Sequence, residues 1–161
     1  MMKNIETMRW VEGEARVNAT FQVGCSDALE RQAGALLNLL LAGAGGALAY
    51  AVNLAEKNAA VWQQSGMAAI SAWLFFVAAL LLLRALWSRP IYGPANDPKN
   101  LKAAHEMSLE DALGHELENR QFCITSNRSR NDAVGRWLNI CRGLASATPL
   151  VFLVAAVVAA C

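Results

Sequence analysis

The stretch AGALLNLLLAGAGGALAYAVNLA, residues 33–55, contains no charged side chain. A helix needs about 20 apolar residues to cross a hydrocarbon core of roughly 30 Å. Similar runs follow at 67–83, between Lys57 and Arg84, and at 143–161. Because a helix satisfies its own backbone groups within lipid, each run is predicted to span a membrane. The predicted fold class is therefore an all-α integral membrane protein with three transmembrane helices.

The three runs divide the 161 residues into four segments. Residues 1–32 are predicted to be a cytoplasmic helix that is able to continue into the first span, and their polar character predicts no cleavable signal peptide. Residues 33–87 are predicted to form a two-helix transmembrane hairpin, and 88–107 a proline-rich connector. Residues 108–161 are predicted to be one long helix, first cytoplasmic and then membrane-spanning, with a kink expected near Pro149.

The basic residues predict the orientation. Lys57 is the only basic residue between the first two spans, whereas the segments before span one and after span two are rich in Lys and Arg. Positive segments stay on the cytoplasmic side. The prediction is a cytoplasmic N-terminus, a cytoplasmic segment at 88–142 and a periplasmic C-terminus.

Small and amide residues form a stripe on one face of the first span. Their spacings of three and four residues place them on one helix face. Such residues allow close approach of helices, and amides bond across helices. Either packing within the bundle, or a subunit interface or pore-lining stripe, fits this pattern. The predicted interface comprises Asn38, Ala42, Gly45, Gly46, Ala49 and Asn53.

A 3.5-residue period runs along the third helical segment and predicts a heptad seam with a polar centre. Two interpretations remain open for the asparagines at its centre. They either set the register of a helical assembly or belong to a solvated helix face. The predicted seam comprises Leu113, Leu117, Ile124, Asn127, Asn131, Val134 and Leu138.

No residue pattern predicts chemistry. The four cysteines have no metal-ligand spacing and are interpreted as small apolar fillers, while His105 and His115 are interpreted as surface residues. No basic stripe with interleaved aromatics predicts nucleic-acid binding. The sequence therefore predicts no enzyme activity, no cofactor, no metal and no nucleic-acid partner.

The order of these features resembles the small transmembrane effectors of bacterial anti-phage nucleotide-signalling systems of the Pycsar type. The residues that carry the resemblance are Arg89-Pro90, 98–101 (Pro-Lys-Asn-Leu), 127–131 (Asn-Arg-Ser-Arg-Asn) and 136–138 (Arg-Trp-Leu). Similar sequences also occur among prophage-type membrane proteins. The resemblance implies a bacterial inner-membrane location and an effector that impairs the membrane of an infected cell. It carries over no nucleotide-binding residue.

The leading hypothesis is an oligomerising, membrane-disrupting effector of phage defence, with membrane lipid and further copies of itself as partners. A cytoplasmic protein or a nucleotide signal is a further expected partner. Two alternatives are a holin-like lysis protein of a prophage and a non-catalytic membrane scaffold that recruits a cytoplasmic partner.

Overall fold

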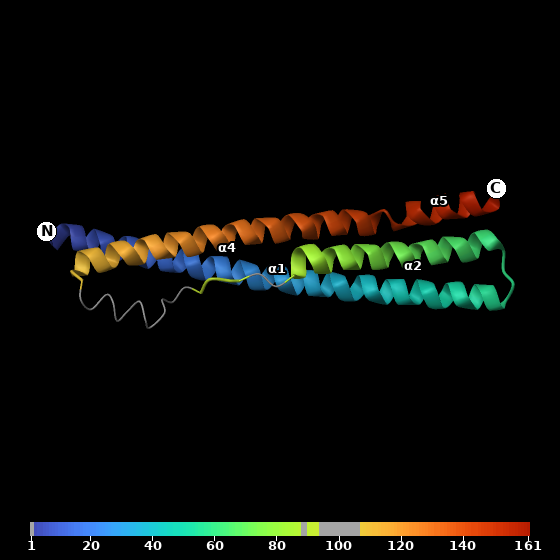
Figure 1. Cartoon of the computed structure of the whole chain (residues 1–161), viewed down its shortest axis with the longest axis horizontal. Coiled ribbons are helices and arrows are strands. Elements are labelled where there is room, and N and C mark those ends of the chain that lie inside the picture. The colour runs from blue at the N-terminus through green and yellow to red at the C-terminus, as the bar shows by residue number, and fades with distance from the viewer. Residues whose placement is uncertain (1, 88–89, 94–106) are drawn as a thin grey trace. The chain divides into compact units, whose positions relative to one another are not determined.

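The structure, a computed structural model, describes residues 2–87, 90–93 and 107–161, and the chain is mainly helical in these residues. Most of the predicted connector, including Arg89, residues 98–101 and His105, lies outside these residues. Figure 1 shows the elements. They are α1 (Met2–Glu56), α2 (Val61–Leu81), the π-helical turn η1 (Leu82–Leu86), α4 (Leu109–Ser146) and α5 (Thr148–Ala160).

Two of these helices, α1 and α2 extended through η1, are long and apolar enough to cross a membrane. The bent pair of α4 and α5 makes a third candidate span if it is counted as one. The all-α class is therefore confirmed, and so is the continuity of α1 from the polar N-terminal segment into the first apolar run. Asn58 ends the turn after α1 with φ at 51°, a left-handed conformation that asparagine tolerates better than most residues.

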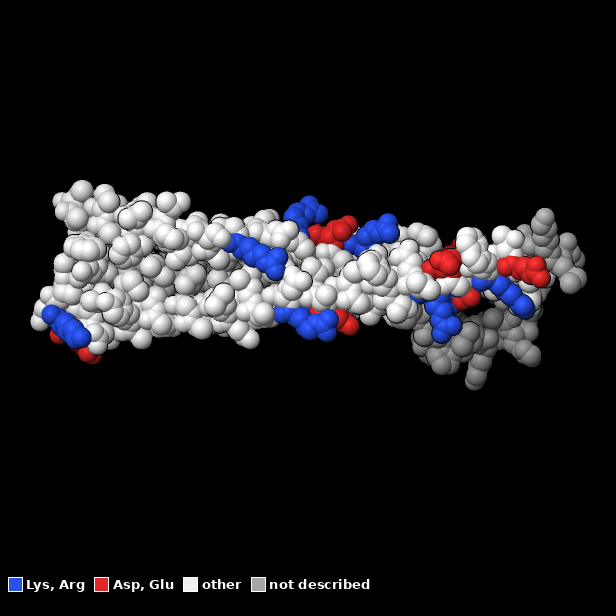
Figure 2. Space-filling view, turned by 180° about the vertical axis from the view of Figure 1, so that it is seen from behind, with Lys and Arg blue, Asp and Glu red and all other residues white. Residues whose placement is uncertain are grey.

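The chain divides into two compact units. The polar unit consists of Met1–Leu29 and Ser88–Asp132, and the apolar unit of Glu30–Trp87 and Ala133–Cys161. Both α1 and α4 contribute to each unit. On the face drawn in Figure 2, the apolar unit is uncoloured over most of its surface, and charged side chains gather towards its ends.

In the apolar unit, α1 packs through a face of small residues. A Cβ added to Gly43 would lie 3.1 Å from Leu74 Cδ1 of α2, so glycine allows α1 and α2 to approach closely. Large apolar side chains such as Phe76 remain exposed on α2. The buried α1 residues of this unit are Ala33, Leu40, Ala44, Ala47 and Ala51.

Contacts between α2 and the third helical segment complete the apolar unit. A Cβ added to Gly66 would lie 2.5 Å from the ring of Phe152 on α5, so only glycine fits there without a shift of the ring. The indole N–H of Trp73 donates to the carbonyl oxygen of Leu144 at 3.0 Å. This bond gives Trp73 a polar partner at a position that is otherwise surrounded by apolar residues.

The long third helix is broken at Ala147, where α4 and α5 meet at 42°. The expected kink is found close to Pro149, as a break that divides the predicted long helix over 108–161 into α4 and α5. Pro149 has no N–H to donate to the carbonyl of Ala145 one turn earlier. The hydroxyl of Thr148 donates to that carbonyl instead, at 2.6 Å. The break therefore leaves this backbone group satisfied, as an apolar environment requires.

Candidate functional site

The predicted interface stripe lies on the uncovered face of α1 in the apolar unit. All six of its residues are exposed. A Cβ added to Gly45 or Gly46 would meet nothing within 4 Å, whereas one added to Gly43 would contact α2. The exposure of these six residues favours a subunit interface or pore-lining stripe over packing within the bundle. Both faces of α1 carry small residues, and the face that contains Ala44 and Ala47 is buried.

Asn38 gives the uncovered face a polar group. It lies six residues beyond Gln32, or about 9 Å along the helix, inside the uncharged run. Its side chain is exposed and bonds to no described residue. An amide left unpaired in hydrocarbon is costly, and a bond to another helix stabilises by about 0.5–2 kcal/mol. Asn53 lies only three residues before Glu56, so it is close to the charged end of the run.

The predicted seam of α4 lies on the buried side of that helix. Leu113 and Leu117 are half-buried. In the polar unit Ile124, Asn127 and Asn131 are buried, and in the apolar unit Val134 and Leu138 are buried. Asn127 is 2% exposed, so the interpretation of this face as solvated is wrong.

Asn127 holds a short non-helical segment, residues 90–93, against α4. Its amide nitrogen donates to the carbonyl oxygen of Tyr92 at 2.8 Å, and its Oδ1 accepts from the Tyr92 backbone N–H at 3.1 Å. The ring of Tyr92 packs edge-on against Phe122, with 5.3 Å between centroids. One asparagine thus satisfies both backbone groups of a residue outside any helix.

Asn131 and Arg130 connect α4 to α1 within the polar unit. The amide nitrogen of Asn131 donates to the backbone carbonyl of Gln22 at 2.9 Å, and Arg130 donates to the hydroxyl of Ser26. Gln22 and Ser26 are both buried. Each of the two seam asparagines therefore bonds to a different part of its own chain.

Arg120 forms the charged part of the same face. Its Nη2 lies 2.8 Å from Glu12 of α1, and its Nε lies 2.8 Å from Glu116 one turn earlier. Its Nη1 is buried and has no partner among the described residues. Sequence reasoning did not identify Glu12, Gln22 or Ser26 as partners. Position 120 does follow the 3.5-residue period, which is the one signal that could have drawn attention to a buried arginine.

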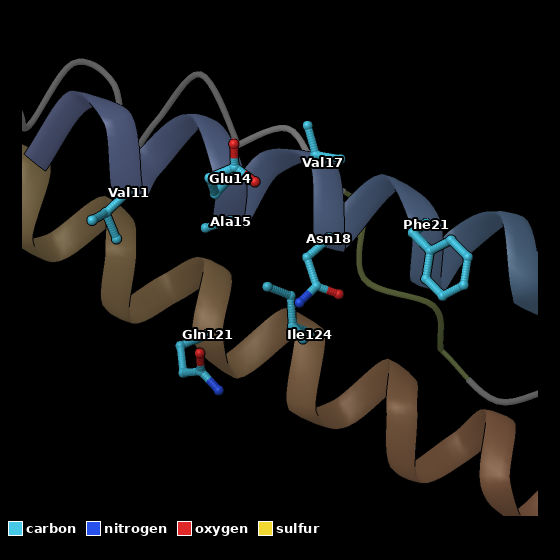
Figure 3. A pocket seen from close by; sticks show the side chains of 8 residues that line it. All are labelled: Val11, Glu14, Ala15, Val17, Asn18, Phe21, Gln121 and Ile124. Atoms are coloured by element: carbon cyan, nitrogen blue, oxygen red, sulfur yellow. The ribbon is translucent and has the colours of Figure 1, made fainter.

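A shallow groove of about 530 Å³ lies between α1 and α4 in the polar unit. Figure 3 shows its lining, with Phe21 and Val17 on α1 and Ile124 on α4. Phe21 and Val17 are 64% and 66% exposed, so the groove presents apolar surface to solvent. Its polar lining residues are Glu14, Asn18 and Gln121.

Reactive groups in the described residues are dispersed. Among these residues no three His, Cys, Asp or Glu side chains gather where they could hold a metal ion. Burial, followed by the nearby Glu116 carboxylate, raises the pKa of the Cys123 thiol above its ordinary value. A thiol that stays protonated is a poor nucleophile and a poor ligand, which fits a packing role for Cys123.

Comparisons with protein families, curated proteins and solved structures found no match. The uncovered face of α1 and the buried face of α4 are therefore the two features of the chain that bear on its function.

Proposed function

We propose that this chain is a small bacterial inner-membrane protein that crosses the bilayer three times and self-associates through the uncovered face of α1. When triggered, the assembly compromises the membrane. The observation that carries this proposal is the exposure of the small stripe. Close helix packing needs small residues, yet the residues from Asn38 to Asn53 that form this stripe are not used for packing within the chain.

The lengths of the uncharged segments support three spans. Residues 33–55 and 61–83 each extend about 34 Å as helices, which matches a hydrocarbon core of about 30 Å. Residues 143–161 would extend about 28 Å as one straight helix, and the 42° bend shortens this length. The orientation follows from the basic residues, with the N-terminus cytoplasmic and the C-terminus periplasmic. A reporter fused after Cys161 is expected to be periplasmic, and one inserted near Ala95 cytoplasmic.

Membrane impairment is supported by the polar Asn38 side chain on the surface through which copies would associate. Copies that associate through this stripe bring Asn38 amides together inside the hydrocarbon zone, where amides bond to one another or to water. The resemblance to nucleotide-signalled effectors points to the same activity.

The direct test is expression of the full chain with a membrane-potential dye, with and without phage challenge. We expect depolarisation by the wild type and a clear reduction by Asn38→Leu or Gly45→Leu. The matched control is Gly143→Leu, because Gly143 is also exposed and a Cβ there would also meet nothing within 4 Å. Unchanged potential at high expression, even under phage challenge, contradicts the effector role. An adjacent nucleotide-cyclase gene supports defence, and an adjacent endolysin gene supports lysis.

The second candidate function is a membrane scaffold that recruits a cytoplasmic partner. The groove lined by Phe21 and Val17 favours it, because exposed apolar surface with a polar rim is typical of protein-binding sites. A pull-down with the full chain in detergent tests this role. Loss of a captured protein in Phe21→Ser, with no loss in Gly45→Leu, would favour the scaffold over the effector.

A further inference from the structure

Arginines from three elements gather at one end of the apolar unit. Arg84 lies in η1, with its guanidinium carbon 5.3 Å from the centroid of the Trp137 ring on α4. Arg136 directly precedes Trp137 in α4. The Trp137 ring therefore joins the arginine at the end of the second apolar run to α4.

A second contact extends this group to α1. Arg142 Nη2 donates to Oε1 of Gln32 at 2.9 Å, and Arg31 directly precedes Gln32 in α1. Arg136 and Arg142 are six residues apart, so they are separated by about 9 Å along α4. This separation is slightly larger than the thickness of the polar headgroup layer on one side of a bilayer, which is about 5–8 Å. We define the arginine band as Arg31, Arg84, Arg136 and Arg142.

The opposite end of the apolar unit lacks such a band. There the charged residues are Glu56 and Lys57, one of each sign. At the arginine end, the one acidic residue of this unit is Glu30. Figure 2 shows several blue side chains, with red ones among them, at one end of the white area of the apolar unit and a single blue and red pair at the other. The unit is thus electrically asymmetric across the thickness of a bilayer.

The arginines of the band retain donors for an external anion. All four are exposed, and none forms an ion pair with a described residue. A cation over an aromatic ring keeps its in-plane N–H groups available, and guanidinium donates to phosphate oxygens in a bidentate manner. Arg84 also lies in a five-residue π-helical turn, a rare geometry that is frequent at functional sites.

We propose that the arginine band binds the phosphate groups of anionic phospholipids in the leaflet at that end of the apolar unit. Basic residues next to a span attract anionic lipid, and Trp137 occupies the interfacial depth that aromatic rings prefer. This inference rests on the proposed membrane insertion, but it does not depend on self-association.

The test is native mass spectrometry of the full chain in neutral detergent with added phosphatidylglycerol or phosphatidylcholine. We expect preferential binding of phosphatidylglycerol, and a loss of roughly thirtyfold in Arg84→Gln/Arg142→Gln. Lys57→Gln, at the opposite end, is the matched control and is expected to bind as the wild type does. Only partial recovery of binding is expected in Arg84→Lys/Arg142→Lys, because lysine restores the charge but not the bidentate guanidinium donors.

Competition with soluble glycerol phosphate distinguishes a site for lipid phosphate from a site for a soluble anion. We expect it not to displace the lipid at equal concentration, and full displacement overturns a lipid site in favour of a soluble anion. Equal binding of the two lipids, or unchanged binding in the double glutamine variant, also overturns the proposal. If that variant does not fold, Arg31→Gln/Arg136→Gln carries the same test. Carbonate extraction of membranes is measured separately, so failure of insertion is distinguished from failure of lipid binding.

Discussion

The two units of this chain bury opposite kinds of side chain. The polar unit encloses Arg120, Asn127 and Asn131, whereas the α1 residues enclosed by the apolar unit are mainly alanines. The apolar unit also leaves many large apolar residues exposed, and Val158 of α5 is 73% exposed. In water such a surface would favour association, while in lipid it is the ordinary solvent-facing surface. The difference indicates that the two units are adapted to different solvents.

The largest effect is expected from breaking the charged group of the polar unit. Arg120→Met leaves Glu12 and Glu116 without their shared cation, and loss of a buried ionic partner costs about 3 kcal/mol. We expect faster amide hydrogen exchange in the first half of α4 and little change in α2. Arg128→Met, at an exposed position of the same helix, is the control. Equal exchange in both variants contradicts a stabilising role for Arg120.

A smaller effect is expected from crowding the apolar unit. Gly66→Ala places a Cβ against the Phe152 ring, and overpacking of this kind costs about 2 kcal/mol. We expect a lower thermal unfolding midpoint in detergent. Gly46→Ala is the matched control, since a Cβ there meets nothing and alanine favours the helix by about 1 kcal/mol. A drop of the same size in both variants would remove the evidence for close packing at Gly66.

The two hydrogen bonds between Asn127 and the Tyr92 backbone are expected to contribute about 1 kcal/mol to the stability of the fold. Asn127→Ala removes both bonds to the Tyr92 backbone, so the Tyr92 amide should exchange its hydrogen faster. Asn139→Ala, at an exposed position, is expected to leave that exchange unchanged. Continued protection of the Tyr92 amide in Asn127→Ala indicates that another group holds this segment.

The smallest effect is expected at the break between α4 and α5. Thr148→Val removes the hydroxyl that donates to the Ala145 carbonyl, and such bonds in membranes average about 0.6 kcal/mol. A small decrease in the thermal midpoint is expected, larger than that of Ser146→Ala, whose hydroxyl bonds to Arg142 at an exposed site. A smaller decrease in the thermal midpoint for Thr148→Val than for Ser146→Ala would show that the break needs no side-chain donor.

Much of the fold follows from local patterns in the sequence. Uncharged runs predicted the apolar helices, and Pro149 predicted the break beside it, because a missing N–H acts within one turn. The 3.5-residue period placed Asn127 and Asn131 on one side of α4, and both are buried there.

The sequence patterns did not predict which residues far apart in the chain contact each other. Asn127 bonds to Tyr92, 35 residues away and outside any helix, and nothing in either local pattern pairs them. The sequence also did not predict which face of α1 packs against other helices. Ala44 and Gly45 are neighbours of similar size, yet Ala44 is buried and Gly45 is exposed. Only the position of α2 distinguishes the two sides.

The central claim is that the uncovered face of α1 joins copies of this chain in the membrane. Counting of photobleaching steps for singly labelled full-length chains, reconstituted into lipid vesicles at low density, tests it most directly. We expect several steps per particle for the wild type and for Gly143→Leu, and a shift towards single steps for Gly45→Leu, because a leucine prevents close approach of two helices. Single steps in the wild type, or an unchanged step distribution in Gly45→Leu, would contradict the claim.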